Sequence, residues 1–183
     1  MTDNKAQIST SEKIYADSLI QAGKDGAMKF DDILKDLNTI NEITSQSKDL
    51  VQVMENPAID DKTKYEIIDS VFSGQINNKI INFLKVLIDK KRFNELDNII
   101  QAYSDELDKI NNIKRVEVVS AVELTDEQIK KLTEKLQNKL QKNIIISREI
   151  NKDIIGGLVI KIDDDVIDNS LKNKLESLSK NII

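Results

Sequence analysis

The densest group of potential metal ligands in the chain is the acidic run Asp163-Asp164-Asp165. Carboxylate oxygens are the ligands that calcium and magnesium ions prefer. The run lacks the Asp-x-Asp-x-Asp-Gly spacing of a calcium loop, and neighbouring residues of a strand point to opposite faces of a sheet. The sequence therefore favours a solvated polar turn, with a carboxylate-dependent metal hydrolase as the enzymatic alternative.

Other residues that could do chemistry are also better explained structurally. Asp60-Asp61 has the position of a helix cap, where a carboxylate meets the positive end of the helix dipole. Asp105, Glu106 and Asp108 are interpreted as the polar face of a helix. Gly156-Gly157 matches neither common phosphate-loop motif. The pair lies in an apolar run typical of a strand, where glycines mark a bulge or the close approach of another backbone.

The amino-acid composition excludes several classes of catalytic and metal site. The 183 residues include no His, Cys or Trp, which excludes histidine-based zinc sites, Ser-His-Asp triads, cysteine nucleophiles and disulfides. Carboxylates, Lys, Ser, Thr and Tyr remain for chemistry, so an enzyme is possible but poorly equipped, and the predictions are no catalytic residue, no cofactor and no metal site. The net charge of −5 argues against a nucleic-acid partner. The basic run Lys90-Lys91-Arg92 is interpreted as a helix end or loop.

Membrane insertion is not expected. The longest apolar stretch, residues 154–160, is far shorter than the roughly 20 residues that span a bilayer. The first residues, Met1 to Lys5, lack the apolar run of a signal peptide. These patterns predict a protein made in the compartment where it works, without direct insertion into lipid.

Apolar residues recur at helical spacing through the first two thirds of the chain. A capping box, Ser9-x-x-Glu12, opens the first predicted helix, and Gly23 with Gly26 is expected to end it. Pro57 is expected to close the third helix. Six helices are predicted, at about residues 10–23, 30–40, 48–55, 60–74, 76–90 and 93–110.

The pattern changes near Asn111. Strands are predicted at about 115–122, 144–146, 158–162 and 166–167. The capping sequence Thr125-x-x-Gln128 opens one helix, and Asp168, Asn169 or Ser170 caps a last one. The predicted fold class is α+β, mainly α, with a six-helix bundle over 1–111 and a small sheet-plus-helix domain over 112–183.

Most of the apolar helical stripes are expected to form the core. A helical bundle of this kind is also able to keep one groove for a partner helix, with anchors at i, i+3, i+4 and i+7. Taken residue by residue, the sequence leads to a two-domain adaptor that binds an amphipathic partner helix, and no further.

The C-terminal segments 154–162 and 166–171 resemble a known family, the delta subunit of F-type ATP synthases, called the oligomycin-sensitivity-conferring protein in mitochondria. The pattern Phe83-Leu84-x-x-Leu87 also matches. Asp163 stands where the family usually has glycine, and Asn169 replaces the glycine of Asp-Gly-Ser. The matching family residues are Tyr15, Ala16, Leu19, Arg92, Gly156, Gly157, Asp168 and Ser170.

The resemblance implies a non-catalytic subunit of the peripheral stalk, or stator, which couples proton-driven rotation to ATP synthesis. Its first domain would bind N-terminal helices of alpha subunits against helices 10–23 and 76–90, and its second domain the C-terminal helices of the b subunits. The implied location is the cytoplasmic face of a bacterial membrane, with the stromal face of the thylakoid as the alternative. The candidate groove residues are Ile14, Ser18, Lys79, Phe83 and Val86.

Overall fold

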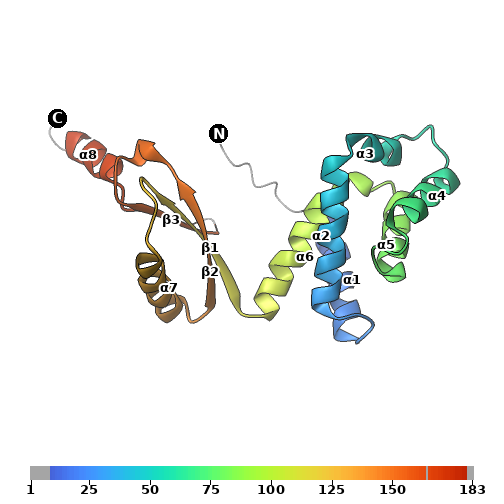
Figure 1. Ribbon diagram of the computed structural model, residues 1–183, viewed down its shortest axis with the longest axis horizontal. Helices are drawn as coiled ribbons and strands as arrows, with labels where there is room; N and C mark the ends of the chain where they lie inside the picture. The colour runs from blue at the N-terminus through green and yellow to red at the C-terminus, as the bar shows by residue number, and fades with distance from the viewer. Residues whose placement is uncertain (1–8, 164, 181–183) are drawn as a thin grey trace. The chain divides into compact units, whose positions relative to one another are not determined.

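The computed structural model describes residues 9–163 and 165–180 (Figure 1). The N-terminal residues Met1 to Lys5 and Asp164, which entered the sequence predictions, lie outside the described residues. The chain divides into two compact units, Met1–Leu107 and Asp108–Ile183. Every strand of the described residues belongs to the second unit. The fold is α+β and mainly helical, as the sequence predicted.

Two helices of the first unit start at predicted capping residues, Ser9 and Asp60. Ser9 and Glu12 form a capping box, in which the Ser9 hydroxyl accepts the Glu12 amide and the Glu12 carboxylate accepts the Ser9 amide. The Asp60 carboxylate accepts the Thr63 amide at 3.0 Å. The elements are α1 (Thr10–Lys24), α2 (Phe30–Gln46), α3 (Lys48–Glu55), α4 (Asp61–Phe72), α5 (Asn78–Asp89), the 3-10 helix η1 (Phe93–Glu95) and α6 (Leu96–Ile110).

The prediction that Gly23 ends the first helix is wrong. Helix α1 continues to Lys24, and the left-handed residue that follows it is Gly26, with φ of 71°. Gly23 instead provides space, because a Cβ atom there would overlap the ring of Phe30 at the start of α2. The glycine thus fixes how closely the beginning of α2 approaches α1.

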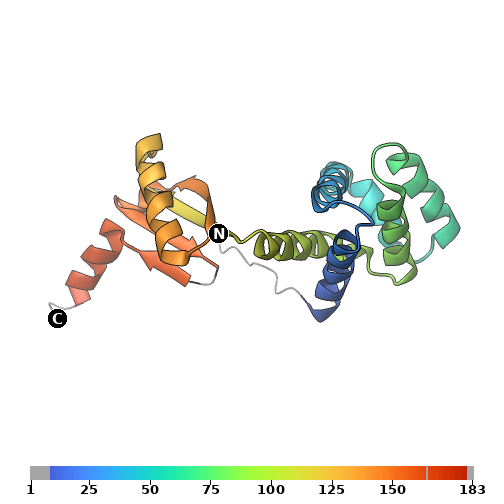
Figure 2. The same ribbon diagram turned by 90° about the horizontal axis from the view of Figure 1, so that it is seen from below.

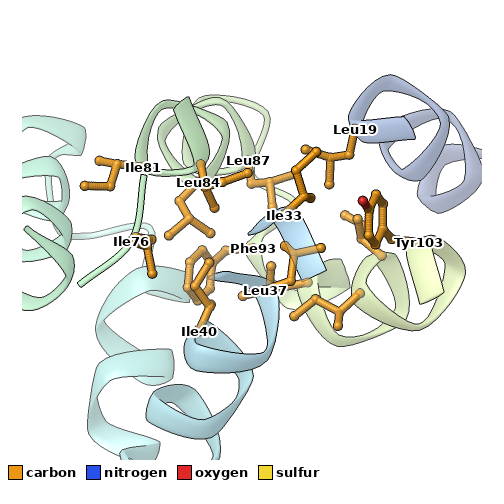
Figure 3. Close-up of a cluster of buried hydrophobic side chains, with 14 of the residues drawn as sticks. Leu19, Ile33, Leu37, Ile40, Ile76, Ile81, Leu84, Leu87, Phe93 and Tyr103 are labelled. Atoms are coloured by element: carbon orange, nitrogen blue, oxygen red, sulfur yellow. The ribbon is translucent and has the colours of Figure 1, made fainter. Parts of the chain in front are cut away.

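The core of the first unit is mainly aliphatic and receives buried side chains from each of the helices α1 to α6. Figure 3 shows Ile33 and Leu37 of α2 close to Leu84 of α5, and all three side chains are fully buried. Tyr103 of α6 is also buried, and its hydroxyl donates to the Phe30 carbonyl at 3.1 Å. Burial, with a smaller contribution from Asp31, raises the pKa of Tyr103 to about 12.

The second unit is a four-stranded sheet in the order β2-β1-β3-β4. Strand β1 runs parallel to β2 and antiparallel to β3, and β3 is antiparallel to β4. The elements are β1 (Ile113–Ser120), α7 (Asp126–Leu140), β2 (Asn143–Ile150), the 3-10 helix η2 (Lys152–Ile154), β3 (Leu158–Ile162), β4 (Asp165–Asp168) and α8 (Leu171–Lys180).

Helix α7 covers one face of this sheet (Figure 2). Its Leu136 packs with Val116 and Val118, which alternate along β1 toward the same face. Between these two, Glu117 points to the other face, where its carboxylate accepts the Lys161 ammonium at 2.7 Å. That bond lowers the pKa of Glu117 below its ordinary value. The face covered by α7 is therefore apolar, whereas the opposite face carries the Glu117–Lys161 pair beside the buried Val119.

The predicted boundaries of the first strand are wrong by two residues. The strand covers 113–120 rather than 115–122. The hydroxyl of Ser120 donates to the Val122 carbonyl at 2.7 Å, which turns the chain out of the sheet. Val122 is consequently exposed, although its residue type favours a strand.

Candidate partner-binding surfaces

Helices α1 and α5 meet through an aromatic contact. The rings of Tyr15 and Phe83 lie edge to face, with centroids 6.2 Å apart and planes at 70°. Both side chains are half-buried and pack against the core, while Ala16 and Leu19 on the inner side of α1 are buried. This contact joins the two helices on which the family resemblance places the candidate groove.

The five candidate groove residues comprise Phe83 of this contact and four residues on the same two helices, and they define what we call the α1/α5 surface: Ile14, Ser18, Lys79, Phe83 and Val86. The side chains of Ile14 and Val86 are 59% and 43% exposed. Ser18 donates its hydroxyl to the Ile14 carbonyl of its own helix at 2.8 Å. The Lys79 ammonium donates to the Ala27 carbonyl at 2.9 Å, so it also ties α5 to the loop after α1. The surface combines exposed aliphatic groups with polar groups engaged inside the unit.

A polar network holds the N-terminal turn of α1. The Glu12 carboxylate is buried and accepts the Asn98 amide at 2.6 Å. Burial raises the pKa of Glu12, but hydrogen bonds from Asn98 and Ser9 outweigh this effect and lower the pKa below its ordinary value. The sequence predicted only the cap. It gave no signal for Asn98, which lies 86 positions away along the chain.

Arg92, one of the residues that match the family, contacts the N-terminal turn of α1 indirectly, through Glu95. Its guanidinium lies 3.3 Å from the Glu95 carboxylate. The same carboxylate accepts the Ser11 hydroxyl at 3.0 Å. Arg92 therefore helps to position α1 against η1. Its neighbours Lys90 and Lys91 end α5, with Lys91 in the left-handed region at φ of 55°, so the basic run is a helix end as predicted.

The glycine pair of the second unit permits a close backbone approach, which confirms the sequence interpretation. Gly157 has φ of 82°, and a Cβ atom there would overlap the Asn169 carbonyl oxygen. A Cβ atom on Gly156 would lie 2.9 Å from the Leu171 side chain. The Leu171 amide donates to the Gly156 carbonyl at 2.8 Å. The pair thus forms the seat for the start of α8.

The family residues Asp168 and Ser170 start α8 itself. Hydrogen bonds from Ser170, first from its side chain and then from its backbone amide, lower the pKa of Asp168. The Ser170 hydroxyl is buried and accepts the Asn173 amide at 3.1 Å. Of the three predicted capping residues, Ser170 is the one whose side chain accepts an amide of the helix.

An apolar surface is exposed on α8. Leu175 is 57% exposed, and Leu171 and Leu178 on the same stripe are also exposed. Next to the start of α8, Ile155 is 61% exposed and has φ of 65° and ψ of −40°. The Gly156 amide donates back to the Ile154 carbonyl at 2.7 Å, which makes a γ-turn centred on Ile155. We call Ile155, Leu171, Leu175 and Leu178 the α8 surface.

The acidic residues that the sequence analysis considered do not come together in one site. In the described part of the chain, no group of three or more acidic side chains is arranged to hold a metal ion. The Asp163 carboxylate pairs with the Lys114 ammonium. Asp105 accepts the Gln101 side chain at 2.8 Å, whereas Asp108 pairs with Arg115. Within residues 9–163 and 165–180, no helix has the length and apolar character needed to cross a bilayer.

Each of the two folded units has apolar side chains exposed on its helices. The family model described as "ATP synthase delta (OSCP) subunit" matches residues 12–182. ATP synthase subunit delta of Clostridioides difficile (strain 630) is 33% identical over 169 residues, covering 92% of this chain and 93% of that protein. ATP synthase subunit delta of Chlorobium limicola is 36% identical over 166 residues, covering 91% of each.

The chain therefore belongs to the ATP synthase delta (OSCP) subunit family, which confirms the resemblance. It is a non-catalytic subunit of the F-type ATP synthase and part of its peripheral stalk, the stator. The fold agrees with a chain in the structure of the Toxoplasma gondii mitochondrial ATP synthase hexamer. That chain gives a TM-score of 0.69 at 17% identity, covering 95% of this chain and 98% of the other.

Proposed function

We propose that this stator subunit joins two parts of the synthase through two separate surfaces, one on each unit. Residues 1–111, with helices α1 to α6 packed as one bundle, bind N-terminal helices of alpha subunits on the catalytic head. Residues 112–183 bind the C-terminal helices of the b subunits. The proposed location is the cytoplasmic face of a bacterial membrane, held by protein contacts. The similarity to delta subunits of two bacteria supports this location over the thylakoid.

The observation that carries the proposal is the Tyr15–Phe83 contact with exposed aliphatic side chains beside it. An amphipathic helix binds by placing apolar anchors against such a pair of helices. Ile14 and Val86 are available for this, and full burial of each contributes about 1.5–3 kcal/mol. The buried side chains of Ala16 and Leu19 anchor α1 in the core of the first unit. A partner helix therefore binds a surface that is already formed.

A stator joint must not dissociate while the rotor applies torque. Nanomolar binding corresponds to about −12 kcal/mol, and part of the gross interaction is lost to ordering the partners. Preformed helices reduce that loss. None of the interactions in this proposal requires a metal ion or a titrating group, so binding by the α1/α5 surface is expected to change little between pH 6 and pH 8.

The α8 surface supports the second half of the proposal. Its leucines recur at i, i+4 and i+7 on one side of a helix whose side chains from 171 to 178 are all exposed. A stripe of this kind is typical of a coiled-coil or helix–helix contact. A helical b-subunit end would cover it and bury the side chain that the γ-turn projects at Ile155.

Two crossed variants test the assignment of partners to surfaces. Ile14→Asp should weaken binding of an alpha N-terminal peptide and leave binding of a b C-terminal peptide unchanged in isothermal titration calorimetry. Leu175→Asp adds the same charge to the other surface and serves as the matched control, with the opposite expectation. If each variant affected both peptides equally, or if the unaltered chain bound neither peptide at micromolar concentration, the proposal would be wrong. Binding only to an unrelated amphipathic helix would favour a general adaptor.

A further inference from the structure

The first unit contains a cavity that plays no part in either proposed surface. Its volume is about 340 Å³, within the range of about 300–1,000 Å³ that is usual for small-molecule sites. Residues of α3, α4, the end of α5 and η1 form its walls. The buried lining residues are Met54, Lys64, Ile88 and Phe93, and the rim is formed mainly by Glu55, Pro57, Asp61, Lys91 and Asn94.

Lys64 is the unusual member of this lining. It is only 6% exposed, although lysine is almost never buried to this degree without a partner. Among the described residues, its ammonium has no hydrogen bond and no ion pair. No fully buried side-chain nitrogen or oxygen in the described chain lacks a hydrogen-bond partner, so the Lys64 ammonium must reach solvent. Lys64 is one of the residues that line the cavity.

The surroundings of Lys64 restrict what can bind beside it. The inner wall offers the apolar side chains of Met54, Ile88 and Phe93. On the rim, Glu55 and Asp61 carry negative charge against the single positive charge of Lys91. With Lys64 included, the positive and negative side chains of the lining balance, so a ligand with several negative charges would be repelled more strongly than a single carboxylate that pairs with Lys64.

We propose that this cavity binds a small organic monocarboxylate with a short apolar body. The carboxylate accepts a hydrogen bond from the Lys64 ammonium, and the apolar body packs on Met54, Ile88 and Phe93. A buried cation gains most from a charged partner because the low local dielectric strengthens the pair. The site is distinct from the α1/α5 surface and the α8 surface. The proposal therefore does not depend on which stator partners those surfaces bind.

The test uses the full-length chain and sodium hexanoate, with methyl NMR signals of Met54 and Ile88 as reporters. We expect saturable shifts of both signals with a dissociation constant of about 1 mM, a usual affinity for so small a ligand. Hexanamide, which has the same shape without the charge, should bind at least about tenfold more weakly. Hexylammonium should not bind.

Two lysine variants in α4 distinguish loss of the Lys64 charge from the general effect of removing a positive charge from this helix. Lys64→Met keeps the length of the side chain and should weaken hexanoate binding at least about tenfold. Lys62→Met removes an exposed charge two positions away and should bind hexanoate as the unaltered chain does. The proposal is overturned if hexanoate produces no saturable shift at 20 times the expected constant, about 20 mM. Equal binding of hexanoate and hexanamide, or equal binding by the two variants, overturns it too.

Discussion

The α1/α5 surface and the α8 surface differ in how their own unit supports them. Helix α1 buries Ala16 and Leu19 on its inner side, and α5 likewise buries Leu84 and Leu87. By contrast, every side chain of α8 from 171 to 178 is exposed. The first surface is the outside of a packed core, whereas the second is a helix attached at one end.

This difference indicates two ways of making a stable joint. The α1/α5 surface exists before its partner arrives, so binding orders few groups. The α8 helix is short, and isolated helices of fewer than about 12–15 residues are marginal in water. Its attachment depends on the Gly156-Gly157 seat and on Ser170. We infer that α8 gains most of its stability when its apolar stripe is covered.

The largest expected effect comes from destroying the seat of α8. Gly157→Ala places a methyl group on the Asn169 carbonyl and forces a left-handed φ on alanine, so we expect a loss of about 3 kcal/mol in the free energy of unfolding. Gly26→Ala is the control, because its φ is also positive but nothing lies within 4 Å of the added methyl. It should cost about 1 kcal/mol. Equal losses in urea denaturation would show that the close approach does not matter.

The next effect concerns binding at the α8 surface. Leu175→Asp should weaken the b C-terminal peptide about 30-fold, because a leucine that is buried on binding contributes about 2 kcal/mol. Its effect on the unfolding free energy should stay within about 0.5 kcal/mol, since the side chain is exposed in the free chain. Ser177→Asp adds the same charge away from the stripe and should bind normally. A large loss of stability in Leu175→Asp would contradict the view that α8 lacks internal support.

The pH dependence of unfolding tests the internal support of α1. The pKa of Glu12 lies below its ordinary value of 4.5, so the charged form stabilises the folded state above pH 4.5, and that stability is lost as the pH falls toward the lowered pKa. Glu12→Gln should lower the free energy of unfolding at pH 7 by about 1–2 kcal/mol and reduce its acid dependence. An unchanged acid profile in thermal unfolding between pH 3 and pH 6 would remove Glu12 from this role.

The smallest effect separates stability from binding at one residue. Ile155→Gly should raise the free energy of unfolding by about 1 kcal/mol, because glycine adopts the positive φ of the γ-turn without strain. The same change removes an exposed apolar side chain and should weaken the b peptide several-fold. If Ile155→Gly lowered the free energy of unfolding and left binding of the b peptide unchanged, Ile155 would contribute to packing within the unit and not to binding.

Local signals in the sequence predicted the helices well. Capping residues are read from neighbours along the chain, so Ser9, Asp60 and Thr125 were identified correctly. The close backbone approach at Gly156-Gly157 was also predicted correctly, because the pair matches no phosphate-loop motif and lies in an apolar run.

Features that depend on distant residues could not be predicted in this way. The role of Gly23 depends on the Phe30 ring, and the network of Glu12 depends on Asn98. The leucine stripe of α8 has the same spacing as a core stripe, so periodicity alone does not show that the fold leaves it uncovered. Lys64 likewise gave no sequence signal, since burial of a lysine is a property of the packed structure.

The central claim is that one chain binds two stator partners through independent surfaces. Its most direct test is size-exclusion chromatography with light scattering on the chain mixed with an alpha N-terminal peptide and a b C-terminal peptide together. Independent surfaces predict a ternary complex of all three, with each peptide binding as it does alone. Displacement of one peptide by the other, so that only binary complexes elute, would contradict the account.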